Sequence, residues 1–185
     1  MVYKRRVCVD CFRLMKARKH IVGYDGDPNP QIIFLGQNPG VKEDSFGKPF
    51  IGMCGKFLKE TIRRRDMRDY RIGYYNVVLC HSPNNSAPTL EEIENCFHNW
   101  ENLLEEKKPE IIVTLGETAR FAVLGVKGGI TKESGKLHHT PYGNVITVVH
   151  PSFAKRSLKG LKIWNDSFDK MEEILWSYII KNIKK

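Results

Sequence analysis

The sequence lacks any long apolar run. No stretch approaches the roughly 20 consecutive apolar residues that cross a bilayer, and residues 1–6 do not form the apolar core of a signal peptide. Internal repeats and low-complexity linkers are absent as well. We therefore expect a cytoplasmic protein with no membrane partner, folded as one domain over residues 1–185, which is long enough to bury a core.

Acidic residues are the scarcer charged class. The chain has 21 Asp and Glu against 30 Lys and Arg, which gives a formal net charge of +9. Such a surface favours a polyanion, but a basic surface that only keeps a protein in solution has the same charge. Charge alone leaves both interpretations open.

Cysteine is present in an odd number. In a reducing compartment a disulfide framework is disfavoured, so metal or cluster binding is the better use of these thiols. By chemistry alone, four thiolates suit either zinc or an iron-sulfur cubane. The five cysteines are Cys8, Cys11, Cys54, Cys80 and Cys96.

Apolar runs and helical spacing predict an α/β protein. Short runs rich in β-branched residues predict strands at residues 31–35, 71–79, 110–115 and 144–149. Helical spacing predicts helices at 54–65, 89–104 and 164–183, with a short helix after Gly116 and a capping residue at Thr89. The alternation indicates a three-layer α/β/α sandwich with a central four-stranded parallel sheet.

Polar residues follow three of the predicted strands. Residues 36–40 read Gly-Gln-Asn-Pro-Gly, Asn76 lies in the second predicted strand, and His150 follows the fourth. Ligands of open α/β sheets bind at the carboxyl ends of the strands, so we expect these side chains at one rim. Taken singly, a tight turn, a backbone cap and a hydrogen-bonded structural histidine explain them equally well. A phosphate-binding P-loop is excluded, because Gly55-Lys56 is followed by Phe57 instead of Ser or Thr.

Taken together, three motifs in this order resemble the uracil-DNA glycosylase superfamily, and within it the iron-sulfur family 4. The first is Gly36 to Gly40 with Glu43-Asp44 and Gly47-Lys48-Pro49-Phe50-Ile51-Gly52; the second is Asn76-Val77-Val78-Leu79-Cys80; the third is Val149-His150-Pro151-Ser152. The resemblance covers nearly the whole chain. It implies an enzyme that flips uracil out of single- or double-stranded DNA and hydrolyses its N-glycosidic bond, acting as a monomer in base excision repair.

The resemblance also implies how the base is held. Gly36 and Gly40 belong to the first motif, and Phe50 is the expected stacking platform for the flipped ring. Asn76 carries both a donor and an acceptor, and it can read the O4 and N3–H edge of uracil, which cytosine presents inverted. Glu43 is expected near C5, where it would hinder the methyl group of thymine.

Catalytic roles follow from the same resemblance. His150 is expected to donate a hydrogen bond to the uracil O2, and backbone N–H groups around Gln37 add to it. Asn38 does not titrate usefully, so its expected role is to hold the attacking water, with Gln37 as a second candidate.

A basic loop follows the third motif. Ser152, Phe153, Lys155 and Arg156 combine an apolar wedge with two cations, which suits insertion into the minor groove, although an ordinary basic helix entry has the same composition. We expect structural or DNA-backbone roles for His138 and His139.

The cysteine spacing matches the family's cluster ligands. Cys8 and Cys11, followed far downstream by Cys80 and Cys96, imply a [4Fe-4S] cluster, with Cys54 as a structural residue. The chain departs from family 4 at Gln37 and Asn38, where Glu followed by Ala or Gly is usual. Asn at this position resembles the mismatch-specific branch, so a glycosylase for hypoxanthine or mismatched thymine is an alternative. A non-catalytic DNA-binding module with a zinc site is another.

Overall fold

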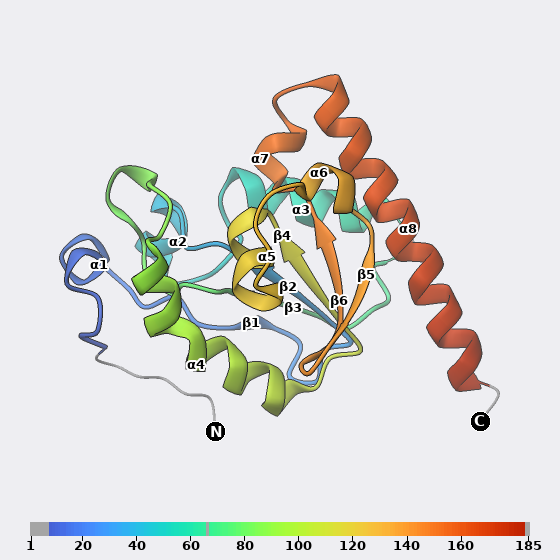
Figure 1. The fold of residues 1–185 in the computed structure, drawn as a ribbon, viewed down its shortest axis with the longest axis horizontal. Coiled ribbons are helices and arrows are strands. Elements are labelled where there is room, and N and C mark those ends of the chain that lie inside the picture. The colour runs from blue at the N-terminus through green and yellow to red at the C-terminus, as the bar shows by residue number, and fades with distance from the viewer. Residues whose placement is uncertain (1–7, 66, 184–185) are drawn as a thin grey trace.

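The fold is a central sheet between two layers of helices (Figure 1). The computed structural model describes residues 8–65 and 67–183, with side chains as far as Ser177. The strands are β1 Asp25–Gly26, β2 Ile32–Gly36, β3 Ile72–Asn76, β4 Ile111–Leu115, β5 Leu137–Thr140 and β6 Gly143–Val148. The sheet order is β1-β3-β2-β4-β6-β5.

The predicted parallel sheet is the centre of a larger one. The pairs β3–β2, β2–β4 and β4–β6 are all parallel, as expected. The predicted count of four strands is wrong, because β1 and β5 pair antiparallel at the two edges. Neither edge strand is an apolar run: β1 has only two residues, and β5 is Leu-His-His-Thr, which forms a hairpin with β6. An edge strand has a neighbouring strand on one side only and is less buried, so its sequence does not need to be a continuous apolar run.

The helices cover both faces. They are α1 Phe12–Ala17, α2 Val41–Phe46, α3 Met53–Arg63, α4 Leu90–Lys107, α5 Glu117–Leu124, α6 Ile130–Glu133, α7 Pro151–Ala154 and α8 Leu158–Ile183, with a 3-10 turn, η1, at Pro83–Asn85. Thr89 forms the predicted capping box with Glu92 at the start of α4. The last helix begins six residues before the predicted start at residue 164.

Alternating side chains of the buried strands form two separate cores. Ile32 and Phe34 of β2 pack with α3 and α8, where Trp164 and Phe168 are completely buried. Ile33 and Leu35 point to the opposite face and pack with the apolar sides of α1, α4 and α5. This is the period-two pattern of a strand buried on both faces, and it gives the three-layer sandwich that the sequence predicts.

The chain direction of the parallel strands determines where a site can form. The arrowheads of β4 and β6 in Figure 1 point toward the end of the molecule where α7 lies. The loops after β2, β3, β4 and β6 therefore gather at this end. None of the helices in the described part of the chain is long and apolar enough to cross a membrane.

Candidate active site

The carboxyl end of β2 lies directly beside that of β3. Gly36 is in register with Asn76, and the backbone N–H groups of Val77 and Val78 donate to the carbonyls of Gly36 and Gln37 at 3.0 Å each. The first and second motifs therefore meet at one point of the rim, as the sequence predicts.

Gly36, Phe50 and Asn76 form a tight group. A Cβ on Gly36 would lie 2.5 Å from Asn76 Oδ1 and 2.7 Å from Phe50 Cζ, so only glycine fits between them. The Phe50 ring packs against Tyr74 at 5.6 Å between centroids. Asn76 is only 4% exposed, and its side chain has no hydrogen-bond partner among the described residues. Buried polar groups are normally hydrogen-bonded, so an amide without a protein partner is available to bind a ligand.

The backbone of Phe50 is strained. Its φ of 54° lies in the left-handed region, which a bulky residue rarely adopts. Glu43 holds the chain nearby, because its Oε1 accepts a hydrogen bond from the Gly52 N–H at 2.7 Å. Glu43 lies in α2, which begins after Gly40. Strain that the surroundings maintain is typical of ligand-binding sites.

Two neighbouring amides are oriented in opposite senses. Asn38 Nδ2 donates to Ser82 Oγ at 3.1 Å, which leaves its Oδ1 as a free acceptor. Gln37 Oε1 accepts from Thr118 Oγ1 at 2.9 Å, which leaves its Nε2 as a free donor. The site therefore presents one acceptor and one donor from adjacent residues.

His150 is held as a neutral imidazole. Its Nδ1 accepts from the Ser152 N–H at 3.2 Å and lies 2.8 Å from Ser152 Oγ. Since Nδ1 accepts, the ring proton of the neutral form is on Nε2. Burial and, to a smaller extent, the charge of Arg156 together lower the His150 pKa to about 4. Gly116, at φ +89°, packs against this side chain: a Cβ there would lie 3.0 Å from His150 Cβ.

The loop after His150 is only partly an exposed wedge. Lys155 and Arg156 are exposed, but Phe153 is partly buried against the core of the α3 and α8 face. The exposed apolar side chain of this segment is Leu158, which is 87% exposed at the start of α8.

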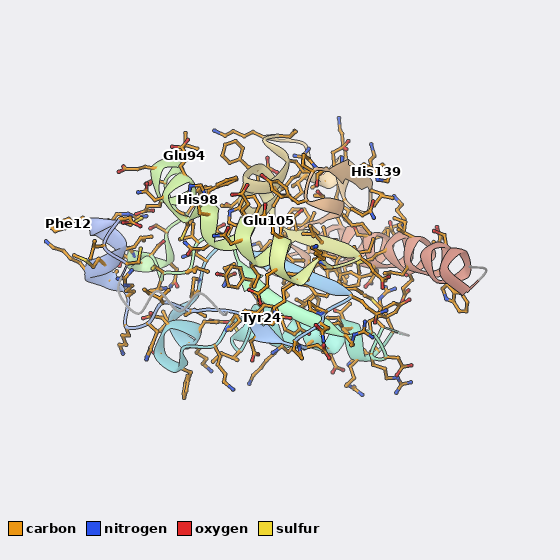
Figure 2. All side chains as sticks on the ribbon, turned by 90° about the horizontal axis from the view of Figure 1, so that it is seen from below. Phe12, Tyr24, Glu94, His98, Glu105 and His139 are labelled. Atoms are coloured by element: carbon orange, nitrogen blue, oxygen red, sulfur yellow. The ribbon has the colours of Figure 1, made fainter. Side chains whose placement is uncertain are left out.

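Four of the five cysteines, Cys8, Cys11, Cys80 and Cys96, lie near one another. Burial raises the pKa of Cys80, and Cys8 and Cys11 raise it further, while Arg18 lowers it. Burial also raises the pKa of Cys96 to about 12, with smaller contributions from the other three. The N-terminal segment contacts the chain after β3, because Ile21 forms an isolated antiparallel β-bridge with Cys80. Figure 2 shows Phe12 of the same N-terminal segment at the outer edge of the molecule.

Burial disfavours the charged form of these thiols, but three side-chain N–H donors contact their sulfur atoms and favour it. Arg18 Nη1 donates to Cys80 Sγ at 3.0 Å, Asn95 Nδ2 to Cys11 Sγ at 3.6 Å, and Asn99 Nδ2 to Cys96 Sγ at 3.7 Å. Among the described residues, no three metal-ligating side chains converge as they would around a single ion. In residue type, four cysteine thiols are the donor set that a [4Fe-4S] cluster uses.

Cys54 is not part of this group. It lies in α3, near Lys155 and Arg156, and burial raises the pKa of its thiol. His138 and His139 are also outside the site, on β5, where His139 Nδ1 is 2.8 Å from Asn144 Oδ1. The structural role of Cys54 and the structural or DNA-backbone roles of His138 and His139 stay predictions.

A model of the family described as "Uracil DNA glycosylase superfamily" matches residues 24–176. The chain belongs to the uracil-DNA glycosylase superfamily. It is 39% identical over 142 residues to a type-4 uracil-DNA glycosylase of Thermotoga maritima, covering 76% of this chain and 74% of that protein. Type-4 uracil-DNA glycosylases of Saccharolobus solfataricus and Sulfurisphaera tokodaii are 34% and 32% identical, covering 93% and 90% of this chain and 83% and 80% of theirs. The family resemblance inferred from the three motifs is confirmed.

Three residues at or near the candidate site were not predicted from the sequence. Ser82 and Thr118 orient the two amides, and no local pattern reveals such contacts between distant segments. Leu158 had a usable signal, because it is an apolar residue between the cations Arg156 and Lys159.

Proposed function

We propose that this protein is a DNA repair enzyme that excises uracil from DNA and leaves an abasic site. The observation that carries the proposal is the neutral His150, whose Nδ1 is occupied by Ser152 and whose Nε2–H is left to donate at the rim. The type-4 relatives support uracil as the base. A buried base cannot be reached in the duplex, so the nucleotide must first be flipped out.

Base recognition is assigned to the group around Gly36. The flipped ring would stack on the Phe50 ring, and the unpartnered Asn76 amide would read the base edge. Glu43 would then stand on the C5 side, fixed by its bond to Gly52. Since cytosine inverts the donor and acceptor at this edge, the amide of Asn76 gives discrimination against it.

Cleavage separates charge between the base and the sugar. The N1–C1′ bond breaks, its electron pair moves onto uracil, and negative charge grows on O2. The His150 Nε2–H stabilises that oxygen, and a preorganised donor of this kind is worth about 3 kcal/mol. Because the ring is neutral, it donates a hydrogen bond without first having to lose or gain a proton.

Water addition is assigned to Asn38. The attacking water must donate a hydrogen bond as its oxygen approaches C1′, so it needs an acceptor, and Asn38 Oδ1 is free to accept. The carbonyl of Gln37 is already occupied by Thr118, so Gln37 can only donate through Nε2. Water forms the new C1′–O bond and releases one proton to solvent, and the uracil anion takes up one proton from solvent at N1, so the sugar and the base both leave neutral.

DNA binding is assigned to the segment from Ser152 to Leu158. The exposed Lys155 and Arg156 would neutralise phosphates, and Phe153 or Leu158 would enter the minor groove. Leu158 has the greater exposure, which favours it as the wedge. We further propose that the protein acts in the cytoplasm as a monomer of one domain.

The thiols of Cys8, Cys11, Cys80 and Cys96 are proposed to hold a [4Fe-4S] cluster. Such a cluster would supply a covalent tie between the N-terminal segment, the loop after β3 and helix α4. The donors from Arg18, Asn95 and Asn99 support a charged group there.

The direct test is base release from a uracil-containing oligonucleotide by the holoprotein. We expect cleavage of uracil DNA, strong loss in the N38A variant, a smaller loss in Q37A, and retained or increased activity in N38D, since a carboxylate also holds water. No uracil release by the unmodified protein would refute the proposal. Asn38 favours a second candidate, a glycosylase of hypoxanthine or mismatched thymine, which the same assay on those duplexes distinguishes.

A further inference from the structure

Ser82 occupies a position where its hydroxyl would ordinarily cap a turn. It is the N-cap residue of η1, and serine at an N-cap usually accepts from a backbone N–H of the following turn. Here the side chain makes no such bond. The residue is completely buried, and its Oγ accepts from Asn38 Nδ2 at 3.1 Å across 44 positions of sequence.

We propose that Ser82 is a positioning residue that fixes the amide of Asn38 so that its carbonyl faces the attacking water. An asparagine amide has a donor end and an acceptor end of nearly the same shape, and only its partners decide which end points where. Among the described residues, Ser82 is the hydrogen-bond partner of the Asn38 side chain. The inference rests on the proposed function, because it deepens the role given there to Asn38.

The neighbouring residue holds the backbone of the same loop. His81 Nδ1 lies 2.9 Å from the carbonyl oxygen of Pro39, directly after Asn38. His81 and Ser82 together therefore contact both residues 38 and 39. Loss of the Ser82 hydroxyl would leave the loop in place through His81 but would free the amide to turn over.

The expected consequence is a loss in chemistry with little loss in binding. A turned amide would present its NH2 group to the water and could no longer accept from it. Misplacement of a reacting group costs up to about a hundredfold in rate, so we expect S82A to lower the single-turnover rate by about 10- to 100-fold. Affinity for uracil DNA should stay within about twofold, because Ser82 is buried and does not reach the ligand.

The experiment is a double-mutant cycle on the holoprotein. Single-turnover rates and DNA affinities are measured for the unmodified protein, S82A, N38A and the double variant, with S82T as the variant that keeps the hydroxyl. S167A is the matched control, because Ser167 is a buried serine of α8 whose hydroxyl bonds Ile163 O and Ser134 Oγ. Melting temperature and visible absorbance confirm the fold and the cofactor of each variant.

The cycle separates positioning from general stabilisation. The inference predicts that S82A slows cleavage, that S82T restores much of the rate, and that S82A adds little in the N38A background. An S82A rate equal to that of the unmodified protein, or an equal loss with and without Asn38, overturns it. Absence of uracil release by the unmodified protein would overturn the proposed function instead.

Discussion

The neutral state of His150 leads to a prediction about both its replacement and its pH dependence. We expect H150A to lower the single-turnover rate of uracil release by about 10² to 10³, the usual effect of removing one preorganised donor from a growing oxyanion, or roughly 3–4 kcal/mol. Binding of uracil DNA should change little, because O2 carries its full negative charge only in the transition state.

The structure determines the direction of the pH effect. Burial, with a smaller contribution from the charge of Arg156, lowers the His150 pKa from its usual 6.5 to about 4. The ring should therefore remain the neutral Nε2–H donor from pH 5 to pH 8, and His150 should add no step to the rate in this range. R156A removes a positive charge and should raise the His150 pKa.

Stability should follow the same pKa difference. Between pH 6.5 and about pH 4, the unfolded chain binds a proton at His150 that the folded chain does not. Since the unfolded state binds more protons, this residue makes the free energy of unfolding decrease as the pH falls through that window. In H150A that contribution to the pH dependence should be absent, which urea unfolding at pH 5 and pH 7 measures.

The assay uses excess enzyme and a labelled uracil oligonucleotide, with strand cleavage at the abasic site as the readout. H150Q is the matched variant, because its side-chain NH2 keeps a donor and should retain more activity than alanine. A rate that falls as the pH rises through 6 to 7 in the unmodified protein, and does not in H150A, would mean that a protonated imidazole acts. That result would refute the reasoning.

Three further predictions concern the cofactor, the DNA loop and the base pocket. Anaerobically purified protein should be brown and contain iron and sulfide, and C96A should lose solubility; equimolar zinc without iron, or a stable C96A protein, contradicts this. K155A and R156A should each weaken binding to all DNA sequences alike and reduce the salt slope by about 1; unchanged affinity in both removes the loop from the interface. G36A should abolish uracil binding without unfolding the protein, because its methyl would lie 2.5 Å from Asn76 Oδ1; normal cleavage by G36A would refute that account of the pocket.

Periodicity predicted the buried parts of the fold. The runs around Ile32 and Ile111 are strands buried on both faces, and Thr89 forms the expected capping box. The edge strands β1 and β5 were missed because they are short and polar. Their pairing depends on an available sheet edge and not on a pattern in their own residues.

The motifs predicted which residues lie together at the strand ends, but they did not predict the exposure and hydrogen bonds of each residue. Strand ends of a parallel sheet share one rim, so the convergence of Gly36 and Asn76 follows from element order alone. Phe153 shows the limit of such reasoning. Its sequence context between His150 and two cations suggested an exposed wedge, but it packs partly against the core while Leu158 is exposed.

The sequence by itself determined the fold class and the order of the strand-end motifs, because periodicity, spacing and residue type are local properties. Only the tertiary structure decided what each amide and imidazole can do. The acceptor of Asn38 depends on Ser82, and the donor of Gln37 depends on Thr118, 81 positions away. Hydrogen-bond direction is a relation between groups in space, and residues far apart along the chain acquire it only when the fold brings them together.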